Sequence, residues 1–556
     1  MSLLAAPIRR AFVVLLTLAA SARAQLPASP ISHLEDAAPI SAGMLRLSIA
    51  NVWTRYDQRF AASGASVPLG DELSADSLGS AQFPRLLPIE AGLRTLAVDP
   101  ALRLSLGRLR VGSNARVVVT PIALEYGVTR RFSIGVLIPI VETRRVAIAT
   151  VSGDSTRANV GYVPTTLRPA AAAANALVSS AFKKAADSLG VLLNNCPSNP
   201  GASGCAAVNA NRADATAARA RAQAFADAAT TLGTTPDQAL VAPRKSSDLA
   251  DTLEARRIQL NARLQQYLGA SAGAATGVFT APTDFSYIDL NGRNGVPAFL
   301  GGPLGGGLDS IHTTERIGFG DIAIGARLLV FDHFQSGSAP PPRVQTRLAV
   351  GAAVRLPTSL PDTAQSLLDI GTGDGAGVDL HSAWDIIVGH VGATIGARYS
   401  KSFGRTVQAP LVNDPLAVYP YPLFGPRTRT AGDVFGLDVT PRILVTDWLA
   451  LDGHYGLERV GPTTFSPATI AQTDPCATCQ SLLGSTVDVS TGASRTAQRY
   501  GVGLRYSTVD AFARGQARYP VEIAYAHLET ASGDAGLPKQ TREQIEVRLF
   551  YQLRRP

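Results

Sequence analysis

Two segments of the chain place carboxylates and a histidine on one face of an extended strand, a constellation that could support acid–base chemistry. They are Asp379, His381 and Asp385 in one segment, and Asp452, His454 and Glu458 in the other. Because side chains alternate across a β-strand, each trio faces away from the mostly apolar residues between its members. Arginines recur at strand spacing in other segments, namely Arg347, Arg355, Arg398, Arg499, Arg505 and Arg548.

The strands that position these residues form a ladder in residues 317–556. The alternation is clearest from Val344 to Leu356, with Val350 and Val354 on one face and Arg347 and Arg355 on the other. Similar segments are expected near residues 317–331, 343–356, 376–390, 391–403, 431–445, 448–459, 496–507, 519–530 and 541–553. Their connections alternate between short and long, which is typical of outer-membrane barrels with short periplasmic turns and long extracellular loops. The pattern predicts an all-β transmembrane antiparallel barrel with its C-terminus in the periplasm.

Residues 25–150 continue the barrel less regularly. Strands are predicted at 45–53, 102–106, 116–126 and 132–140, with 86–98 as a weaker candidate. This gives about fourteen strands, or twelve if 86–98 and one neighbouring segment lie in the lumen as a plug, since single-chain bacterial barrels have even strand numbers. A soluble β-sandwich or propeller would show similar alternation. Strands of about ten residues or more favour the barrel, because globular sheets usually have strands of five or six.

Within such a barrel, the two charged trios are interpreted as structural ion pairs that line the lumen. Unpaired charges in a confined lumen would be costly, so acidic and basic strands are expected to pair side by side. The first trio is expected to pair with Arg347, Arg355 and Arg398 and so to narrow the pore. No convincing serine nucleophile motif lies beside either trio. We therefore expect no enzyme activity, no cofactor and no metal, and a membrane-embedded hydrolase is only the third alternative.

The first 24 residues are typical of a secretory signal peptide. A basic pair, Arg9 and Arg10, precedes an apolar run from Ala11 to Ala20, and Ala22-Arg23-Ala24 is a small-x-small cleavage site. No later apolar stretch is long enough to cross a bilayer as a helix. The charged fraction of 17% is below the roughly 25% of soluble proteins, which fits a surface that faces lipid. The formal charge of +8 is too small and dispersed to indicate nucleic acid as a partner.

Residues 151–316 form an Ala-rich insertion with helical periodicity. Apolar residues recur every three or four positions from Val178 to Leu192, from Ala215 to Leu232 and from Leu249 to Tyr267, with Ser246 or Ser247 as the cap of the third helix. These helices are expected to form a hairpin and a third helix in an extracellular loop, followed by a flexible Gly-rich tail at 301–307. The insertion is either a spacer that packs on itself or a lid or receptor-like element over the barrel mouth.

Four cysteines in an exported chain fall into two close pairs. Cys196 and Cys205 flank a turn-rich loop at the tip of the helical hairpin, and Cys476 and Cys479 are separated by two residues. Two local disulfides are expected in an oxidising compartment. The second pair has the spacing of a redox or metal motif, but it stands alone in a loop without a second ligand pair, which favours a structural disulfide.

The hairpin from Leu124 to Pro139, together with Gly318 to Ile322 and Val354 to Thr358, resembles the group described as the meta-pathway phenol-degradation channel, which is distantly similar to fatty-acid channels. The resemblance covers about half of the mature chain and implies passive or facilitated passage of small, often hydrophobic or aromatic solutes. The expected location is the bacterial outer membrane. The expected partners are outer-membrane lipid, the barrel-assembly machinery during biogenesis and a small-molecule solute. A structural or adhesive surface protein with a sealed barrel and a helical binding element is the alternative.

Overall fold

The computed structural model describes most of the chain after residue 35. The described residues are 36–38, 40–80, 83, 86–152, 158–245, 247–269, 277–280, 313–334, 343–361, 370–410, 424–466, 494–513 and 515–553. The predicted signal peptide, Ser246, the Gly-rich tail at 301–307 and the Cys476 and Cys479 pair lie outside them.

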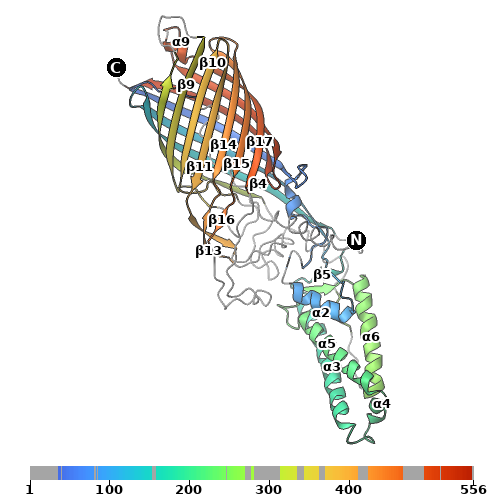
Figure 1. Cartoon of the computed structure of the whole chain (residues 1–556). Coiled ribbons are helices and arrows are strands. Elements are labelled where there is room, and N and C mark those ends of the chain that lie inside the picture. Colours follow the sequence, from blue (N-terminus) through green and yellow to red (C-terminus); the bar gives the residue numbers. More distant parts are fainter. Residues whose placement is uncertain are drawn as a thin grey trace, which may run out of the picture.

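Twelve antiparallel strands close into a barrel, because β1 (Met44–Phe60) pairs both with β3 (Arg108–Gly127) and with the last strand, β19 (Pro538–Gln552) (Figure 1). The strands between β3 and β19 are β4 (Phe132–Ser152), β8 (Ile322–Asp332), β9 (Val344–Leu356), β10 (Gly377–Val388), β11 (Val391–Ser402), β14 (Val434–Leu444), β15 (Leu449–Val460), β17 (Arg495–Ser507) and β18 (Val521–Gly533). The short β7 (Thr314–Phe319) continues the line of β8 beside β4, and β2 (Ser66–Pro68) folds back onto the end of β1.

The barrel has an apolar outer face and a polar inner face. Outward residues such as Ile324, Leu380 and Val502 are exposed, whereas the inward positions of the same strands hold small or charged residues that are mostly buried. A closed barrel leaves no unpaired strand edge, which satisfies the backbone of a chain surrounded by lipid. These features make it a transmembrane barrel. No helix among the described residues is both long and apolar enough to span a bilayer.

The connections at one end of the barrel are short or moderate, and most at the other end are long. Gly389 and His390 join β10 to β11, and Val445 to Trp448 join β14 to β15, at the end that also holds the C-terminus and the start of β1. The opposite end carries a small sheet of β12 (Arg405–Pro410), β13 (Phe424–Thr430) and β16 (Thr464–Phe465). It also carries the helical module, while one connection there, between β18 and β19, is short.

The helical module draws on two loops of the barrel rather than one. The loop between β4 and β7 supplies α3 (Arg168–Asn195), α4 (Cys205–Ala210), α5 (Arg212–Thr231) and α6 (Asp248–Leu268), as well as the strand pair β5 (Val160–Tyr162) and β6 (Val241–Pro243). The loop between β1 and β3 supplies the short helix η1 (Leu69–Leu73), which packs on β3, and α2 (Leu87–Ala97), which packs on α5. Phe182 of α3 stacks on Phe225 of α5 at a ring separation of 4.6 Å, and Ser247 caps α6 by accepting from the Ala250 amide.

The weaker strand predicted at residues 86–98 is wrong, because this segment is the helix α2. Its buried residues Ile89, Leu93 and Leu96 are spaced by three and four, the period of a helix, and Pro88 stands in its first turn. The strand predicted at 102–106 is also absent, and Leu104 and Leu106 are instead buried in the core of the helical module. The barrel therefore has the twelve strands of the alternative count, but neither segment lies in the lumen.

A long hairpin links the barrel to the module. β3 and β4 have 20 and 21 residues, whereas the barrel strands β8, β9, β10, β11, β14, β15, β17 and β18 have 11 to 13. Their ends beyond the barrel pair continuously, and Leu109, Val111, Ala147 and Val151 enter the core of the module. The extended hairpin is thus an arm onto which the helices pack.

A disulfide joins Cys196 to Cys205 at the tip of the module, as predicted from their spacing. Opening it with Cys196→Ser and Cys205→Ser should lower the free energy of unfolding of the module by about 2.5 to 3 kcal/mol, because the unfolded chain regains the conformational entropy that closure of a loop of this length removes. Urea-dependent proteolysis of the module would measure the change, with Ser198→Ala in the same loop as the control. An unchanged midpoint in the double variant would contradict the prediction.

Candidate functional site: the barrel lumen

The structure places all twelve charged residues singled out from the sequence on the inner face of the barrel. Strand pairing brings them to this face in register, since Arg347 stands opposite Asp385, His381 opposite Arg398, and Glu522 opposite Arg548. The side chains of Arg355, Asp385, Asp452, His454, Glu458, Arg499, Arg505 and Arg548 are buried, and those of Arg347, Asp379, His381 and Arg398 are half-buried.

Two of the expected ion pairs form between β9 and β10. Arg347 Nε lies 2.8 Å from Asp385 Oδ2, and Arg355 Nε lies 3.2 Å from Asp379 Oδ2. Asp385 also accepts from the Thr394 hydroxyl at 2.7 Å, and Asp379 accepts from Ser400. These carboxylates are therefore held by neighbours on both sides.

Arg398 does not pair with the β10 trio as expected. Its side chain crosses the backbone of Gly436 on β14, where a Cβ atom would lie 2.3 Å from its Nε, and reaches Glu458 on β15 at 2.5 Å. Arg499 Nη2 contacts the same Glu458 oxygen at 2.6 Å. One carboxylate is thus shared by two guanidinium groups. A glycine opposite a long side chain is the signal by which this pairing could have been predicted.

A second charged cluster lies nearer the short-turn end of the barrel. Asp452 lies 2.7 Å from Arg442, and Arg505 lies 3.1 Å from Glu522. Arg548 lies 2.7 Å from Glu546. The first two pairs join neighbouring strands, and Arg548 and Glu546 both lie on β19. These ion pairs hold the long side chains along the inner wall.

The two histidines pack against glycines on neighbouring strands. His381 lies over Gly351, where a Cβ atom would meet its Nε2 at 2.1 Å, and His454 lies beside Gly503. His454 Nδ1 is 3.3 Å from the Thr440 hydroxyl. Across the described residues, no cluster of three or more His, Cys, Asp and Glu could hold a metal ion. The surroundings of both histidines are those of packed lumen side chains.

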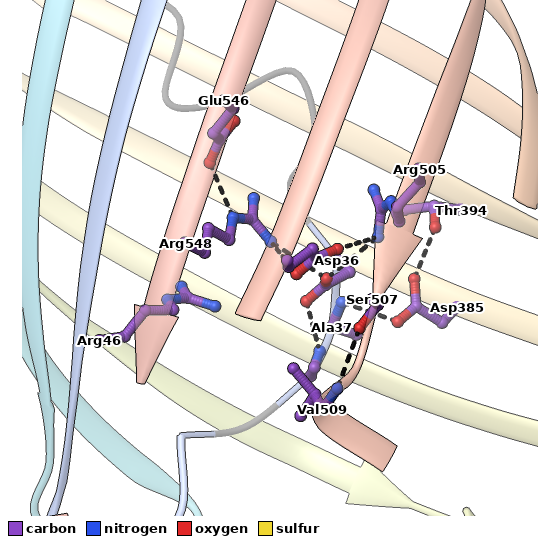
Figure 2. A network of polar contacts seen from close by, with 12 residues as sticks. Asp36, Ala37, Arg46, Asp385, Thr394, Arg505, Ser507, Val509, Glu546 and Arg548 are labelled. Atoms are coloured by element: carbon purple, nitrogen blue, oxygen red, sulfur yellow. Dashed lines mark hydrogen bonds and ion pairs between the residues drawn. The ribbon is translucent and has the colours of Figure 1, made fainter. Parts of the chain in front are cut away.

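A feature that the sequence reasoning missed is the segment just before β1. Asp36 and Ala37 are buried inside the barrel (Figure 2). The Asp36 carboxylate accepts from Arg505 at 3.4 Å and from Arg548 at 3.2 Å, and Arg327 donates to its backbone carbonyl. We call residues 36–38 the strap.

The strap is held by its backbone as well as by its charge. The Ala37 amide donates to Asp385 Oδ2 at 2.9 Å, the same oxygen that contacts Arg347. Ala37 packs with Leu329, Ala349 and Ala383, and the small side chains of the two strand alanines leave room for a chain along the inner wall. The only hint in the sequence is the acidic pair Glu35-Asp36 followed by two alanines, which specifies no location.

A cavity of about 120 Å³ lies beside the strap. Its wall is mostly apolar and small, with Ala50, Ala123, Leu137, Ala323, Gly325 and Ala353 among the lining residues. Its polar lining residues are Ser48, Ser133, His381, Asp36, Arg46, Glu125, Arg327, Glu546 and Arg548. Arg46 is itself bound by Glu125 at 2.7 Å, so its charge is already compensated. The lumen thus contains ion pairs along its wall and, beside the strap, this mostly apolar cavity, which we call the recess.

Comparisons with known proteins add a distant likeness in fold. No family model matches the chain, and no curated protein matches it. An outer-membrane channel from Pseudomonas putida F1 is 9% identical at a TM-score of 0.38, over 94% of this chain and 100% of that chain. The CymD monoaromatic hydrocarbon channel is 8% identical at 0.26, and a FadL homologue of Pseudomonas aeruginosa is 10% identical at 0.24, each over 92% of this chain and 90% of its own.

Proposed function

We propose that the chain is a bacterial outer-membrane channel for small, apolar solutes. The observation that carries the proposal is the recess in the lumen, which is lined by small apolar side chains next to the strap. Apolar atoms form most of the exposed surface of this recess. An apolar cavity of about 150 Å³ is known to admit benzene. The recess, of about 120 Å³, is therefore of the right order for a small aromatic or aliphatic molecule.

Solute flux through purified protein tests this function. Liposomes containing the channel should take up small aromatic and aliphatic compounds faster than empty liposomes. Ala323→Phe, which fills the recess, should lower this flux several-fold. Ile324→Phe is the matched control, because residue 324 is next in the strand but faces lipid. Flux that is equal in both variants would show that solutes do not use the recess.

The alternative of a sealed, adhesive surface protein draws its support from the helical module, which has its own core and disulfide. A complete lack of flux in well-folded protein, also after the strap is released, would favour it.

The orientation of the barrel can be tested separately. Because extracellular loops are usually the longer ones, we expect the helical module outside the cell. Protease added to intact cells should cut within residues 155–310. Cleavage that requires a permeabilised outer membrane would reverse the orientation and leave the channel proposal standing.

A further inference from the structure

The lipid-facing surface of the barrel contains a groove of about 580 Å³ across β8, β9, β10 and β11. Its floor is made of small outward side chains, Ala326, Ala352, Ser382 and Ala397, and the inward-facing Arg327, Gly351, His381 and Arg398 also line it. Ala326 stands opposite Ala352, and Ser382 stands opposite Ala397. Between β9 and β10 the floor steps diagonally from Ala352 to Ser382, because Ala352 stands opposite Leu380 and Ser382 opposite Val350. Ligand pockets in proteins commonly have volumes of about 300 to 1,000 Å³, and this groove falls within that range.

Two rows of large side chains form the walls of the groove. On the side of the short turns, Phe132, Leu328 and Val350 are consecutive strand partners. On the side of the long loops, Leu380, Tyr399 and Phe435 are consecutive partners as well. These six side chains contribute to the lining and are partly or largely exposed. Because partners in register stand side by side on one face, each row forms a ridge along the floor.

Cationic side chains stand beyond the wall on the side of the long loops. Lys401 follows Tyr399 on the same face of β11, two residues or roughly 7 Å further along the strand. Arg459 is exposed opposite Phe435 and donates to Ser494 at 3.0 Å. The Asp433 carboxylate accepts from the Tyr399 hydroxyl at 2.5 Å. Positive charge next to an apolar groove matches a lipid with an anionic head group.

We propose that this groove binds one acyl chain of a phosphorylated membrane lipid, with the phosphate at Lys401 and Arg459. The apolar floor and walls complement a hydrocarbon chain. The small side chains of the floor lie between the large side chains of the walls, and this forms a depression in the outer surface of the barrel. A second copy of the chain is the other occupant that such a surface could take. Its outward face would have to insert a ridge into the groove, and the cations beyond the wall would gain no partner from an apolar barrel wall. The proposal is independent of what passes through the lumen.

The number and type of lipid molecules that remain bound to the purified protein test the proposal. Barrels reconstituted with phosphatidylglycerol and then extracted into a mild detergent should retain about one lipid per chain in native mass spectrometry, and fewer when phosphatidylcholine is used. Ala352→Leu with Ala397→Leu should abolish most of this retention by filling the floor. Lys401→Gln with Arg459→Gln should lower it several-fold and remove the preference for the anionic lipid.

The matched control is Ala393→Leu, which lies on the outer face of β11 but does not line the groove. It should retain lipid like the unsubstituted protein, and the solute flux of all variants should stay unchanged. Equal retention in the filled and control variants would overturn the proposal. Dimers that disappear when the floor is filled would also overturn it, in favour of a second copy as the occupant.

Discussion

Asp36→Asn should open the channel. The substitution removes the charge that accepts from Arg505 and Arg548, while the strap keeps its length and its small residues. A hydrogen bond to a charged group contributes about 1.5 to 3 kcal/mol, so the equilibrium between a seated and a released strap should shift by roughly 10- to 100-fold. In planar bilayers we expect a higher mean conductance or a larger fraction of time in the open level.

The control for this prediction is Asp76→Asn. The Asp76 carboxylate pairs with Arg108 and Arg110 outside the lumen, so its loss should leave the conductance unchanged. The reverse experiment fixes the strap in place. Ala37→Cys with Ala383→Cys should form a disulfide under oxidation, since both residues pack in one cluster, and conductance should then fall until a reductant is added. A conductance that responds to neither change would mean that the strap does not obstruct the path.

The local sequence pattern predicts the barrel strands and their faces well, and the reason is physical. In a membrane barrel most strand positions that face lipid must be apolar, and charge is concentrated in the lumen, so the alternation is strict from Val344 to Leu356. Arg347 and Arg355 could therefore be assigned to the inner face from spacing alone. Partners on adjacent strands follow from the order of strands, as the contacts of these arginines with Asp385 and Asp379 show.

The features missed from sequence depend on contacts between distant segments. The sequence of α2 predicts a strand because its 11 residues, rich in Leu, also suit a strand, and only its packing on α5 separates the two. The strap lies in the lumen because residues more than 340 positions away bind it: Asp385 accepts from the Ala37 amide, and Arg505 and Arg548 donate to Asp36. The spacing of apolar and polar residues along a strand or helix does not reveal such a contact. Likewise, Arg398 reaches Glu458 only because Gly436 stands between them.

The ion pairs of the lumen should set the charge preference of the channel, and reciprocal variants should shift it in opposite directions. Arg347→Ala with Arg355→Ala leaves Asp385 and Asp379 without these guanidinium partners, so cations should be favoured. Glu458→Gln removes the carboxylate shared by Arg398 and Arg499, so anions should be favoured. A unit charge about 4 Å from a permeating ion is worth roughly 1 kcal/mol in water, or about a fivefold change in permeability ratio.

Reversal potentials across a salt gradient measure these shifts, and the spectroscopic signature of the barrel shows whether each variant is folded. Arg116→Gln is the matched control, since Arg116 pairs with Glu142 on the outer side of β3 and β4, and its loss should leave the reversal potential unchanged. Asp385 also contacts the strap, and Arg347 contacts Asp385, so removal of the strap in the same variants separates two effects. If the preference shifts with and without the strap, the arginines act directly on the ion. If the shift vanishes when the strap is absent, Arg347 acts by holding Asp385 against the Ala37 amide. An unchanged preference in all folded variants would place the permeation path away from these ion pairs.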